Sequence, residues 1–442
     1  MGKYFGTDGI RGKYNEELTV DLAFKVGNAI SRLGEKIKIV IGKDTRKSGD
    51  ALIASFSSGA LCGGASVTNV GVCPTACISY LTTKFEFDFG VIITASHNPA
   101  IYNGIKVFSK SGRKIDSALE EKIEELMSNS HFASYLDVGT YVYSPKLIDS
   151  YVGYIDSLFK MDLTGKKIVL DCSNGASSFV AEKLFKMKNA DVVLLGGSPN
   201  GININENCGA LHTENLQKKV TELNANFGYA YDGDADRIIA VTEKGDVLSG
   251  DVLIYIFGMY LQKKEKLNPP IVVGTRQTNM GLENELSSKG IQLIRTDIGD
   301  KYISLEIEKQ GLMLGGETAG HIIINDFLPT GDGVLNSMFL TYIMETTKTK
   351  LSDYQNLKLY EQVNLSIEVN NKDLVMESEK LNSFIKMKQY SLDGLGRILV
   401  RKSGTEPCIR IMVESADYEK SKEIASQIYQ KMIEIDMDYS KI

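Results

Sequence analysis

Short apolar runs alternate along the chain with segments in which apolar residues recur at helical spacing. In the first third, the runs that predict buried strands occupy residues 38–41, 66–70 and 91–93. The helical segments between them cover 18–33, 48–62 (with Ser48 as N-cap) and the residues from Thr75 onward. This alternation predicts a mostly parallel sheet packed between helices.

The same layout returns twice further along the chain. A strand, a short polar loop with glycine and a helix follow one another at residues 41–46, 171–175 and 273–279. We interpret this as a threefold internal repeat of one α/β unit. From about residue 363 the pattern changes to an α+β arrangement. Its predicted strands are 363–369, 396–401 and 408–413, and its predicted helices are 372–387 and the segment from Asp417.

The length of 442 residues exceeds what one ordinary hydrophobic core organises. The expected fold class is therefore α/β, with three similar mixed-sheet α/β domains followed by a C-terminal α+β domain. The expected domains are 1–150, 151–250, 251–362 and 363–442. The polar, irregular stretch 129–150 fits the first boundary.

Composition narrows the class of protein. The chain is 43% hydrophobic and 24% charged, as globular proteins are, and its net charge is −6. This balance argues against a nucleic-acid partner, although a few focused Arg and Lys side chains still suit an anionic substrate. Six cysteines without a CxxC pair are expected to be reduced thiols. No apolar run approaches about 18 residues and the first residues lack an export signal, so we expect a cytoplasmic protein without a membrane partner.

One predicted strand leads directly into a candidate reactive group. Residues 91–93 are followed by Thr94-Ala-Ser-His-Asn-Pro99, and Asn-Pro stops regular structure. Ser96 should therefore lie on a loop at the carboxyl end of a strand, where open α/β sheets keep their chemistry. The Asn103-Gly104 pair predicts a turn that brings Lys106 near Ser96. Glycines around Arg11 suggest a tight loop that delivers its guanidinium to an anion.

A second candidate site is the run Asp232-Gly-Asp-Ala-Asp-Arg237, which follows a buried strand. In a flat strand the outer aspartates would lie ~13 Å apart, but the small residues between them let the chain curl until Asp232, Asp234 and Asp236 converge. Clustered carboxylates need a neutralising cation, and oxygen ligands favour Mg²⁺. An EF-hand fits poorly because Arg237 stands where glycine is required; a solvated acidic turn is the other alternative. Arg237 would add a phosphate clamp.

Two further polar loops carry candidate binding groups. The first surrounds a glycine with guanidinium and hydroxyl groups that suit a phosphate, namely Arg401, Ser403, Gly404, Thr405 and Arg410. A polar hairpin tip is its alternative interpretation. The second, Gly315–His321, follows the predicted strand 312–314. Glu317 could accept hydrogen bonds from sugar hydroxyls, and His321 could be an acid/base group or a structural histidine.

Together these motifs resemble the α-D-phosphohexomutases. The matching segments, in the order of that family, are Thr94–Pro99, Asp232–Arg237, Gly316–His321 and Arg401–Pro407. The resemblance covers essentially the whole chain and implies four domains around a central cleft. The opening Lys3–Gly12 and the segments Gly201–Asn205 and Cys208-Gly209 are most similar to the branch that acts on glucosamine phosphates.

The resemblance also implies roles for individual residues. Ser96 would be phosphorylated, and one Mg²⁺ per active site would be held by that phosphate and by Asp232, Asp234 and Asp236. The groups near the transferring phosphoryl group would be Arg11, Lys106, Arg237 and His321. The substrate contacts would be Glu317, Thr318, Arg401, Ser403, Gly404, Thr405 and Arg410. Thr318 and Ala319 stand where this branch usually has Gln and Ser.

The expected activity is interconversion of glucosamine 6-phosphate and glucosamine 1-phosphate, feeding UDP-N-acetylglucosamine synthesis. A hexosamine 1,6-bisphosphate would be the intermediate and activator. Alternatives are a phosphomannomutase/phosphoglucomutase with the same mechanism, a non-catalytic sugar-phosphate sensor, and a hydrolase using either Ser96 with His97 or Asp232 with Asp234. Against the first hydrolase version, adjacent Ser and His side chains are expected to point apart, and no Gly-x-Ser-x-Gly motif is present. The expected partner is a small phosphosugar, bound by a monomer or homodimer.

Overall fold

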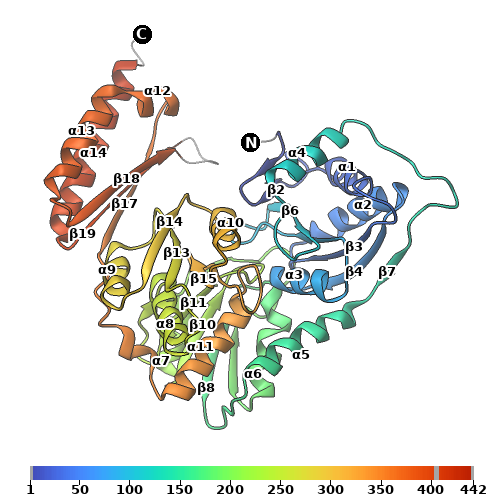
Figure 1. Ribbon diagram of the computed structural model, residues 1–442, viewed down its shortest axis with the longest axis horizontal. Helices are drawn as coiled ribbons and strands as arrows, with labels where there is room; N and C mark the ends of the chain where they lie inside the picture. Colours follow the sequence, from blue (N-terminus) through green and yellow to red (C-terminus); the bar gives the residue numbers. More distant parts are fainter. Residues whose placement is uncertain (1–2, 403–407, 440–442) are drawn as a thin grey trace. The chain divides into compact units, whose positions relative to one another are not determined.

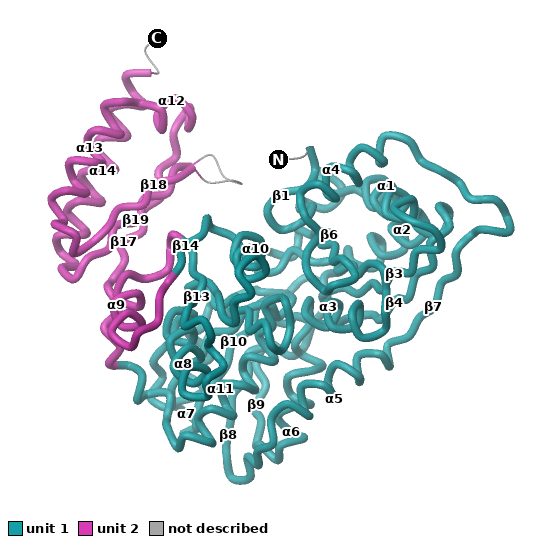
Figure 2. The backbone as a smooth tube through the Cα atoms, in the orientation of Figure 1, with its two compact units in different colours: residues 1–275, 294–355 teal, residues 276–293, 356–442 magenta. Residues whose placement is uncertain are grey.

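The computed structural model describes residues 3–402 and 408–439. Their strands form sheets of seven, five, four and three strands, with helices packed on them (Figure 1). Figure 2 shows two compact units, residues 1–275 with 294–355 and residues 276–293 with 356–442. The predicted fold class, three mixed-sheet α/β arrangements and a C-terminal α+β one, is confirmed.

The first sheet has the strand order β1-β2-β6-β5-β3-β4-β7. Its strands are β1 (Phe5–Gly6), β2 (Gly9–Lys13), β3 (Lys38–Lys43), β4 (Ser66–Val72), β5 (Phe89–Ile93), β6 (Tyr102–Ser109) and β7 (Tyr141–Tyr143). The accompanying helices are α1 (Val20–Ile30), α2 (Gly49–Cys62), α3 (Thr75–Lys84) and α4 (Ser117–Leu126). The apolar strand residues Ile39, Ile41 and Val91 share one buried core with Val26 of α1 and Phe56 of α2.

The second and third sheets are smaller. The second contains β8 (Lys167–Asp171), β9 (Asp191–Leu195), β10 (Phe227–Tyr231), β11 (Ile238–Thr242) and β12 (Val247–Leu248), with helices α5 (Ile148–Leu158), α6 (Ala181–Met187) and α7 (Glu214–Glu222). The third contains β13 (Ile271–Thr275), β14 (Gln292–Thr296), β15 (Leu314–Gly316) and β16 (Ile322–Ile324). The helices of this part of the sequence are α8 (Gly250–Lys263), α9 (Met280–Ser288), α10 (Asp300–Gln310) and α11 (Gly333–Thr347).

The three sheets repeat one strand order, which reads β6-β5-β3-β4, β11-β10-β8-β9 and β16-β15-β13-β14. If the four strands of each set are numbered in chain order, the third strand runs parallel to the first and antiparallel to the fourth. The predicted threefold repeat is therefore present in the topology. Its third strands, β5, β10 and β15, lead into the loops that carry Ser96, the three aspartates and Glu317.

The C-terminal sheet is antiparallel, with the order β17-β19-β18. Its strands are β17 (Gln362–Glu368), β18 (Gly396–Lys402) and β19 (Cys408–Ser415), and its helices are α12 (Lys372–Glu377), α13 (Glu379–Ser391) and α14 (Tyr418–Tyr439). The single helix expected over 372–387 is two helices. Extended backbone at Ser378 ends the first, and its side chain accepts a hydrogen bond from Leu381 N to begin the second.

Local expectations were wrong in three places in the first sheet. Asn103 and Gly104 do not form a turn but lie inside β6, paired with β2, because a side chain at Gly104 would meet Thr94 O at 2.4 Å and a strand can approach this closely only at glycine. The glycine-rich start is a β1–β2 hairpin rather than a loop. The irregular stretch 129–150 contains the edge strand β7, which pairs with β4.

Candidate active site

The serine loop begins where β5 ends. Ser96 is buried and has a φ of 51°, a left-handed conformation that few residues other than glycine adopt. Its N–H donates to Thr94 Oγ1 at 2.9 Å, and its hydroxyl donates to Asp232 Oδ2 at 2.5 Å. The structure thus brings the predicted serine directly against the predicted carboxylate cluster.

The same backbone conformation changes the relation between Ser96 and His97. Their side chains were expected to point apart, but Ser96 Oγ lies 3.4 Å from His97 Nδ1 because the left-handed residue curls the loop. Burial lowers the pKa of His97 to about 3, and the charges of Arg237 and Arg11 add to this effect. His97 is therefore an uncharged imidazole at neutral pH.

The carboxylate loop closes on itself directly after β10. Ala235 has a φ of 59°, and its N–H donates to Asp232 O at 3.0 Å. This turn brings ligand oxygens of Asp232, Asp234 and Asp236 within 4.8 Å of one another, all of them buried. The predicted convergence is confirmed.

This cluster fits a divalent metal ion. Within the described residues, Oδ1 of Asp234 and Oδ1 of Asp236 are buried without a hydrogen-bond partner. A buried carboxylate oxygen without a partner carries a desolvation cost that a bound cation removes. Together with Asp232, these two carboxylates form a hard oxygen donor set, which makes this a candidate metal site.

Lys106 is the nearest cationic side chain to the cluster. Its Nζ lies 2.9 Å from Asp234, 3.2 Å from Asp236 and 3.2 Å from Asp8. Burial alone would lower the pKa of Lys106, but these carboxylates raise it well above its ordinary value. Burial and the neighbouring aspartates raise the pKa of Asp232, whereas Lys106 and His321 overcome burial and lower that of Asp236.

Further cationic groups surround the carboxylates. The guanidinium of Arg11 pairs with Asp8. Nε of Arg237 lies 3.9 Å from Asp236 Oδ1, while the backbone N–H of Arg237 donates to Asp232 Oδ1 at 3.1 Å. The ring of His321 lies between two acids, with Nδ1 3.6 Å from Asp236 and Nε2 3.6 Å from Asp300. Burial would lower the pKa of His321, but these acids raise it to about 9, so the ring is protonated at neutral pH.

The predicted sugar loop is the connection between β15 and β16. Glu317 Oε1 accepts a hydrogen bond from Gly299 N at 3.2 Å, and burial raises the pKa of Glu317. The hydroxyl of Thr318 is buried and, among the described residues, has no hydrogen-bond partner. The loop therefore holds a carboxylate and a hydroxyl with unused hydrogen-bonding capacity.

The predicted phosphate loop belongs to the other compact unit. Ser403, Gly404 and Thr405 lie outside the described residues. Arg401 of β18 and Arg410 of β19 lie directly opposite each other, and burial together with Arg410 lowers the pKa of Arg401. Facing like charges destabilise a strand pair, so an anion that lies between them would be stabilising.

Sequence reasoning missed several charged residues of this site. Asp8 accepts from Lys114, and Lys114 also pairs with Asp300. Asp8 carried a signal, since it stands between Gly6 and Gly9 in the same segment as Arg11. Lys114 and Asp300 carried none, because they meet only through the folding of distant segments.

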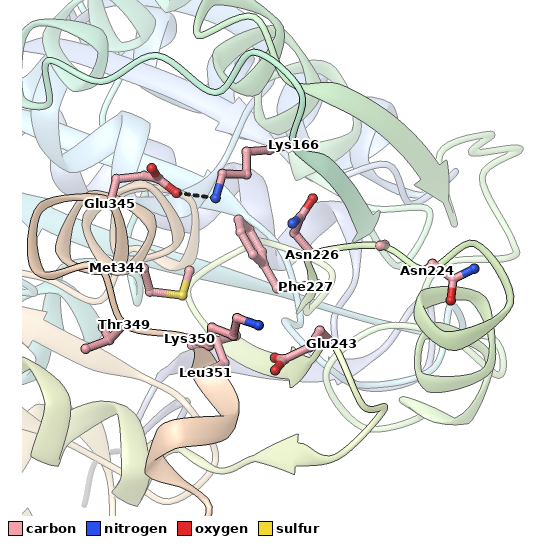
Figure 3. Close-up of a pocket in the computed structure, with 11 residues that line it drawn as sticks. Lys166, Asn224, Asn226, Phe227, Glu243, Met344, Glu345, Thr349, Lys350 and Leu351 are labelled. Carbon is pink, nitrogen blue, oxygen red and sulfur yellow. Dashed lines mark ion pairs between the residues drawn. The ribbon is translucent and has the colours of Figure 1, made fainter.

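A separate pocket of about 340 Å³ lies between the start of β10 and the end of α11 (Figure 3). An ion pair of Lys166 with Glu345, 3.0 Å long, lies at its wall, and Phe227, Met344 and Leu351 supply apolar surface. None of its lining residues is a predicted site residue.

Family models for the phosphoglucomutase/phosphomannomutase α/β/α domains I, II and III match residues 2–134, 149–245 and 249–360, and the C-terminal domain model matches 365–431. The chain is 44% identical to phosphoglucosamine mutase from Clostridioides difficile (strain 630), covering 97% of this chain and 98% of that one. It is 41% identical to phosphoglucosamine mutase from Clostridium novyi (strain NT), and that match covers 98% of this chain and 99% of the relative.

Solved structures share the fold at low sequence identity. A phosphoglucomutase/phosphomannomutase family protein from Burkholderia thailandensis has a TM-score of 0.81 at 22% identity, over 97% of this chain and 96% of that one. N-acetylphosphoglucosamine mutase from Aspergillus fumigatus, crystallised with GlcNAc-6P and magnesium, has a TM-score of 0.67 at 16% identity. That match covers 98% of this chain and 96% of the other. Across residues 3–402 and 408–439, no helix has the length and hydropathy of a membrane span.

Proposed function

The chain belongs to the phosphoglucosamine mutase group of the phosphoglucomutase/phosphomannomutase family, and on this basis we propose that it interconverts glucosamine 6-phosphate and glucosamine 1-phosphate. The observation that carries the proposal is the 2.5 Å contact between Ser96 Oγ and Asp232 in a buried carboxylate cluster. A hydroxyl oxygen next to a candidate metal site supports the proposal, because phosphoryl transfer uses an oxygen that carries the group and a cation that neutralises its charge.

In the proposed reaction, phosphorylated Ser96 gives its phosphoryl group to the C1 hydroxyl of glucosamine 6-phosphate. The bond from phosphorus to Ser96 Oγ breaks, a bond from phosphorus to the C1 oxygen forms, and the C1 hydroxyl proton passes to Ser96 Oγ. The 1,6-bisphosphate then turns within the site. The bond from phosphorus to the C6 oxygen breaks, a bond from phosphorus to Ser96 Oγ forms, and the Ser96 hydroxyl proton passes to the C6 oxygen. Glucosamine 1-phosphate is the product, and the enzyme is again phosphorylated.

The cationic side chains stabilise the charge of the transferring group. Lys106, Arg11 and Arg237 lie around the carboxylates, and protonated His321 adds a further positive charge. Fixed donors of this kind lower the barrier where negative charge develops. Asp232, Asp234 and Asp236 would hold Mg²⁺, which when bound supplies Lewis-acid stabilisation of the phosphoryl oxygens.

Substrate recognition is proposed to use two loops. Glu317 and Thr318 would face the sugar hydroxyls, and the non-reacting phosphate would bind at Arg401 and Arg410 with Ser403, Gly404 and Thr405. The second assignment is supported by Arg401 and Arg410, which lie opposite each other on β18 and β19 and carry guanidinium groups that suit a phosphate. Division into domains 1–150, 151–250, 251–362 and 363–442 and a cytoplasmic location also remain proposals.

A substrate panel tests the proposed function. Hexose and hexosamine 6-phosphates are assayed for 1-phosphate formation, and peptide mass spectrometry measures phosphate on Ser96. Glucosamine 6-phosphate should be converted fastest, without release of inorganic phosphate, and Ser96→Ala should be inactive. Preference for glucose or mannose 6-phosphate would favour the phosphomannomutase/phosphoglucomutase alternative, and phosphate release would indicate a hydrolase.

A further inference from the structure

Arg46 and Asn205, to which the proposed reaction assigns no role, contact the backbone of the serine loop. We propose that Asn205, together with Arg46, is a positioning residue that holds Ser96 in its left-handed conformation against the carboxylate loop. This inference rests on the proposed function, because it matters only if Ser96 carries the phosphoryl group. Asn205 lies in the segment Gly201–Asn205, to which the proposed reaction assigns no role.

The contacts form a clamp on two carbonyl groups. Arg46 Nη2 donates to Ser96 O at 2.9 Å and to Asn98 O at 2.8 Å. Asn205 Nδ2 donates to the same two oxygens, at 2.9 Å and 3.1 Å. Each carbonyl therefore accepts two hydrogen bonds, which uses both of its lone pairs. Both carbonyl groups are consequently fixed in direction on either side of His97.

Arg46 is itself held rigidly. Its side chain is fully buried, and its Nε lies 3.1 Å from Asp44 Oδ2. Asp44 also accepts from Thr94 Oγ1 at 2.7 Å, and Thr94 in turn accepts from Ser96 N. The N–H and the C=O of Ser96 are thus connected within the first α/β repeat by the hydrogen bonds of Thr94 and Arg46 and by the ion pair of Arg46 with Asp44.

Asn205 adds a contact from the second repeat. Its own N–H donates to Ser173 O at 2.8 Å, in the loop after β8. A Cβ atom placed on Gly233 of the carboxylate loop would lie 2.9 Å from Asn205 Nδ2 and 2.6 Å from Ser96 O. Asn205 Nδ2 therefore lies beside the point where the carboxylate loop touches the serine loop.

The clamp stabilises a backbone conformation that is otherwise unfavourable. A left-handed conformation is unfavourable for a residue other than glycine and persists only where surrounding contacts impose it. Loss of two of the four hydrogen bonds would let the loop relax and move Ser96 Oγ away from Asp232. Because no contact to substrate is lost, we expect kcat to fall while KM is preserved.

The test compares two asparagines of the same loop. Asn205→Ala removes both contacts to the serine loop. Asn203→Ala is the matched control, since Asn203 Nδ2 donates to Ser198 O within its own loop. We expect Asn205→Ala to lower kcat roughly 10- to 100-fold, the effect of a small displacement of a reacting group, with KM within about twofold. Asn203→Ala should leave kcat within about twofold.

A second variant and a second measurement separate positioning from folding. Asn205→Asp keeps the size of the side chain but replaces the donor with an acceptor facing two carbonyls, so it should be at least as slow as Asn205→Ala. Melting temperatures of the variants are compared, and the Ser96 phosphate in each is measured by mass spectrometry. A lower phosphorylated fraction in the Asn205 variants alone would support the inference.

The inference and the proposed function fail in distinguishable ways. If wild-type protein carries no phosphate on Ser96 and does not isomerise glucosamine 6-phosphate, the proposed function is wrong. If wild-type protein does both, and Asn205→Ala and Asn205→Asp match Asn203→Ala in kcat, the positioning role is wrong. Equal losses in all three variants would mean that the loop acts only through its own fold.

Discussion

The serine loop and the carboxylate loop occupy the same place in two repeats and are stabilised differently. Each follows the third strand of its sheet, and each turns through one left-handed residue, Ser96 or Ala235. The carboxylate loop is closed by its own backbone and by Gly333 N, which donates to Ala235 O at 2.9 Å. The serine loop also closes one turn through its own backbone, where Asn98 N donates to Ala95 O at 3.0 Å, but its Ser96 and Asn98 carbonyl groups are held by the side chains of Arg46 and Asn205.

This difference separates two requirements of phosphoryl transfer. The carboxylate loop must collect negative charge, and short side chains at alternate positions achieve this locally. The serine loop must present one oxygen in one direction, which needs donors fixed by the rest of the fold. A short sequence motif can therefore specify the clustered negative charge, whereas contacts with the rest of the fold set the direction of the Ser96 oxygen.

The largest predicted effect concerns the charge of the carboxylate loop. Asp234→Asn replaces a proposed metal ligand with a weaker neutral one and leaves Lys106 with one anionic partner fewer, so activity should fall by about three orders of magnitude or more. Steady-state kinetics with titrated Mg²⁺ checks this, and chelator-treated wild type should lose its activity and regain it with Mg²⁺. Full activity of the chelated enzyme would contradict the metal assignment.

A substitution between the loops tests how closely they must approach. Gly233→Ala places a Cβ atom 2.6 Å from Ser96 O and 2.8 Å from Ile204 Cδ1. We expect the serine loop to shift and kcat to fall roughly 100-fold, the scale of a displacement of about 1 Å. Gly153→Ala is the control, because a Cβ atom there has no atom within 4 Å. If Gly233→Ala and Gly153→Ala behave alike, the loops do not need this contact.

Asp332, which forms no ion pair within the described residues, shows how burial acts on a carboxylate. Asp332 accepts from Tyr151 and from Leu335 N at the start of α11, and burial raises its pKa from 3.8 to about 6. The folded state therefore binds the proton more tightly than the unfolded state, and this contribution to stability is lost as pH rises through about 6. Thermal unfolding of wild type should show that loss, and Asp332→Asn should not.

The size of this pH effect is bounded by the pKa shift. At 1.36 kcal/mol per unit, the shift corresponds to at most about 3 kcal/mol at pH 8. Asn at this position can still accept from Leu335 N and can donate to Tyr151, so the variant should fold. An unchanged pH dependence in Asp332→Asn would assign the effect to other groups.

The smallest predicted effect concerns the sugar loop. Ala319→Ser adds a hydroxyl beside Glu317, and one hydrogen bond to a sugar is worth about 0.5–1.5 kcal/mol. We expect kcat/KM for the best substrate to rise several-fold. Thr318→Val removes the buried unpartnered hydroxyl and should lower it by a similar factor. Steady-state kinetics of both variants on glucosamine, glucose and mannose 6-phosphates measure these changes. An unchanged sugar preference in both variants would show that this loop does not set specificity.

The sequence predicted those features that depend on local patterns. Apolar periodicity located most strands and helices, and the spacing of Asp232, Asp234 and Asp236 was enough to predict their convergence. The turn predicted at Asn103-Gly104 was wrong because the turn preference of this pair is weaker than the pairing of β6 with β2. The contact of Ser96 with His97 was missed because it depends on a left-handed residue that no local pattern announces.

Lys106 has a consequence for the cost of burying the acidic groups of the site. Its ammonium contacts three carboxylates, of which Asp234 and Asp236 are buried with it and Asp8 is partly exposed. The chain therefore supplies a positive charge of its own to these acids, which offsets part of the cost of burying them together whether or not a metal ion is bound.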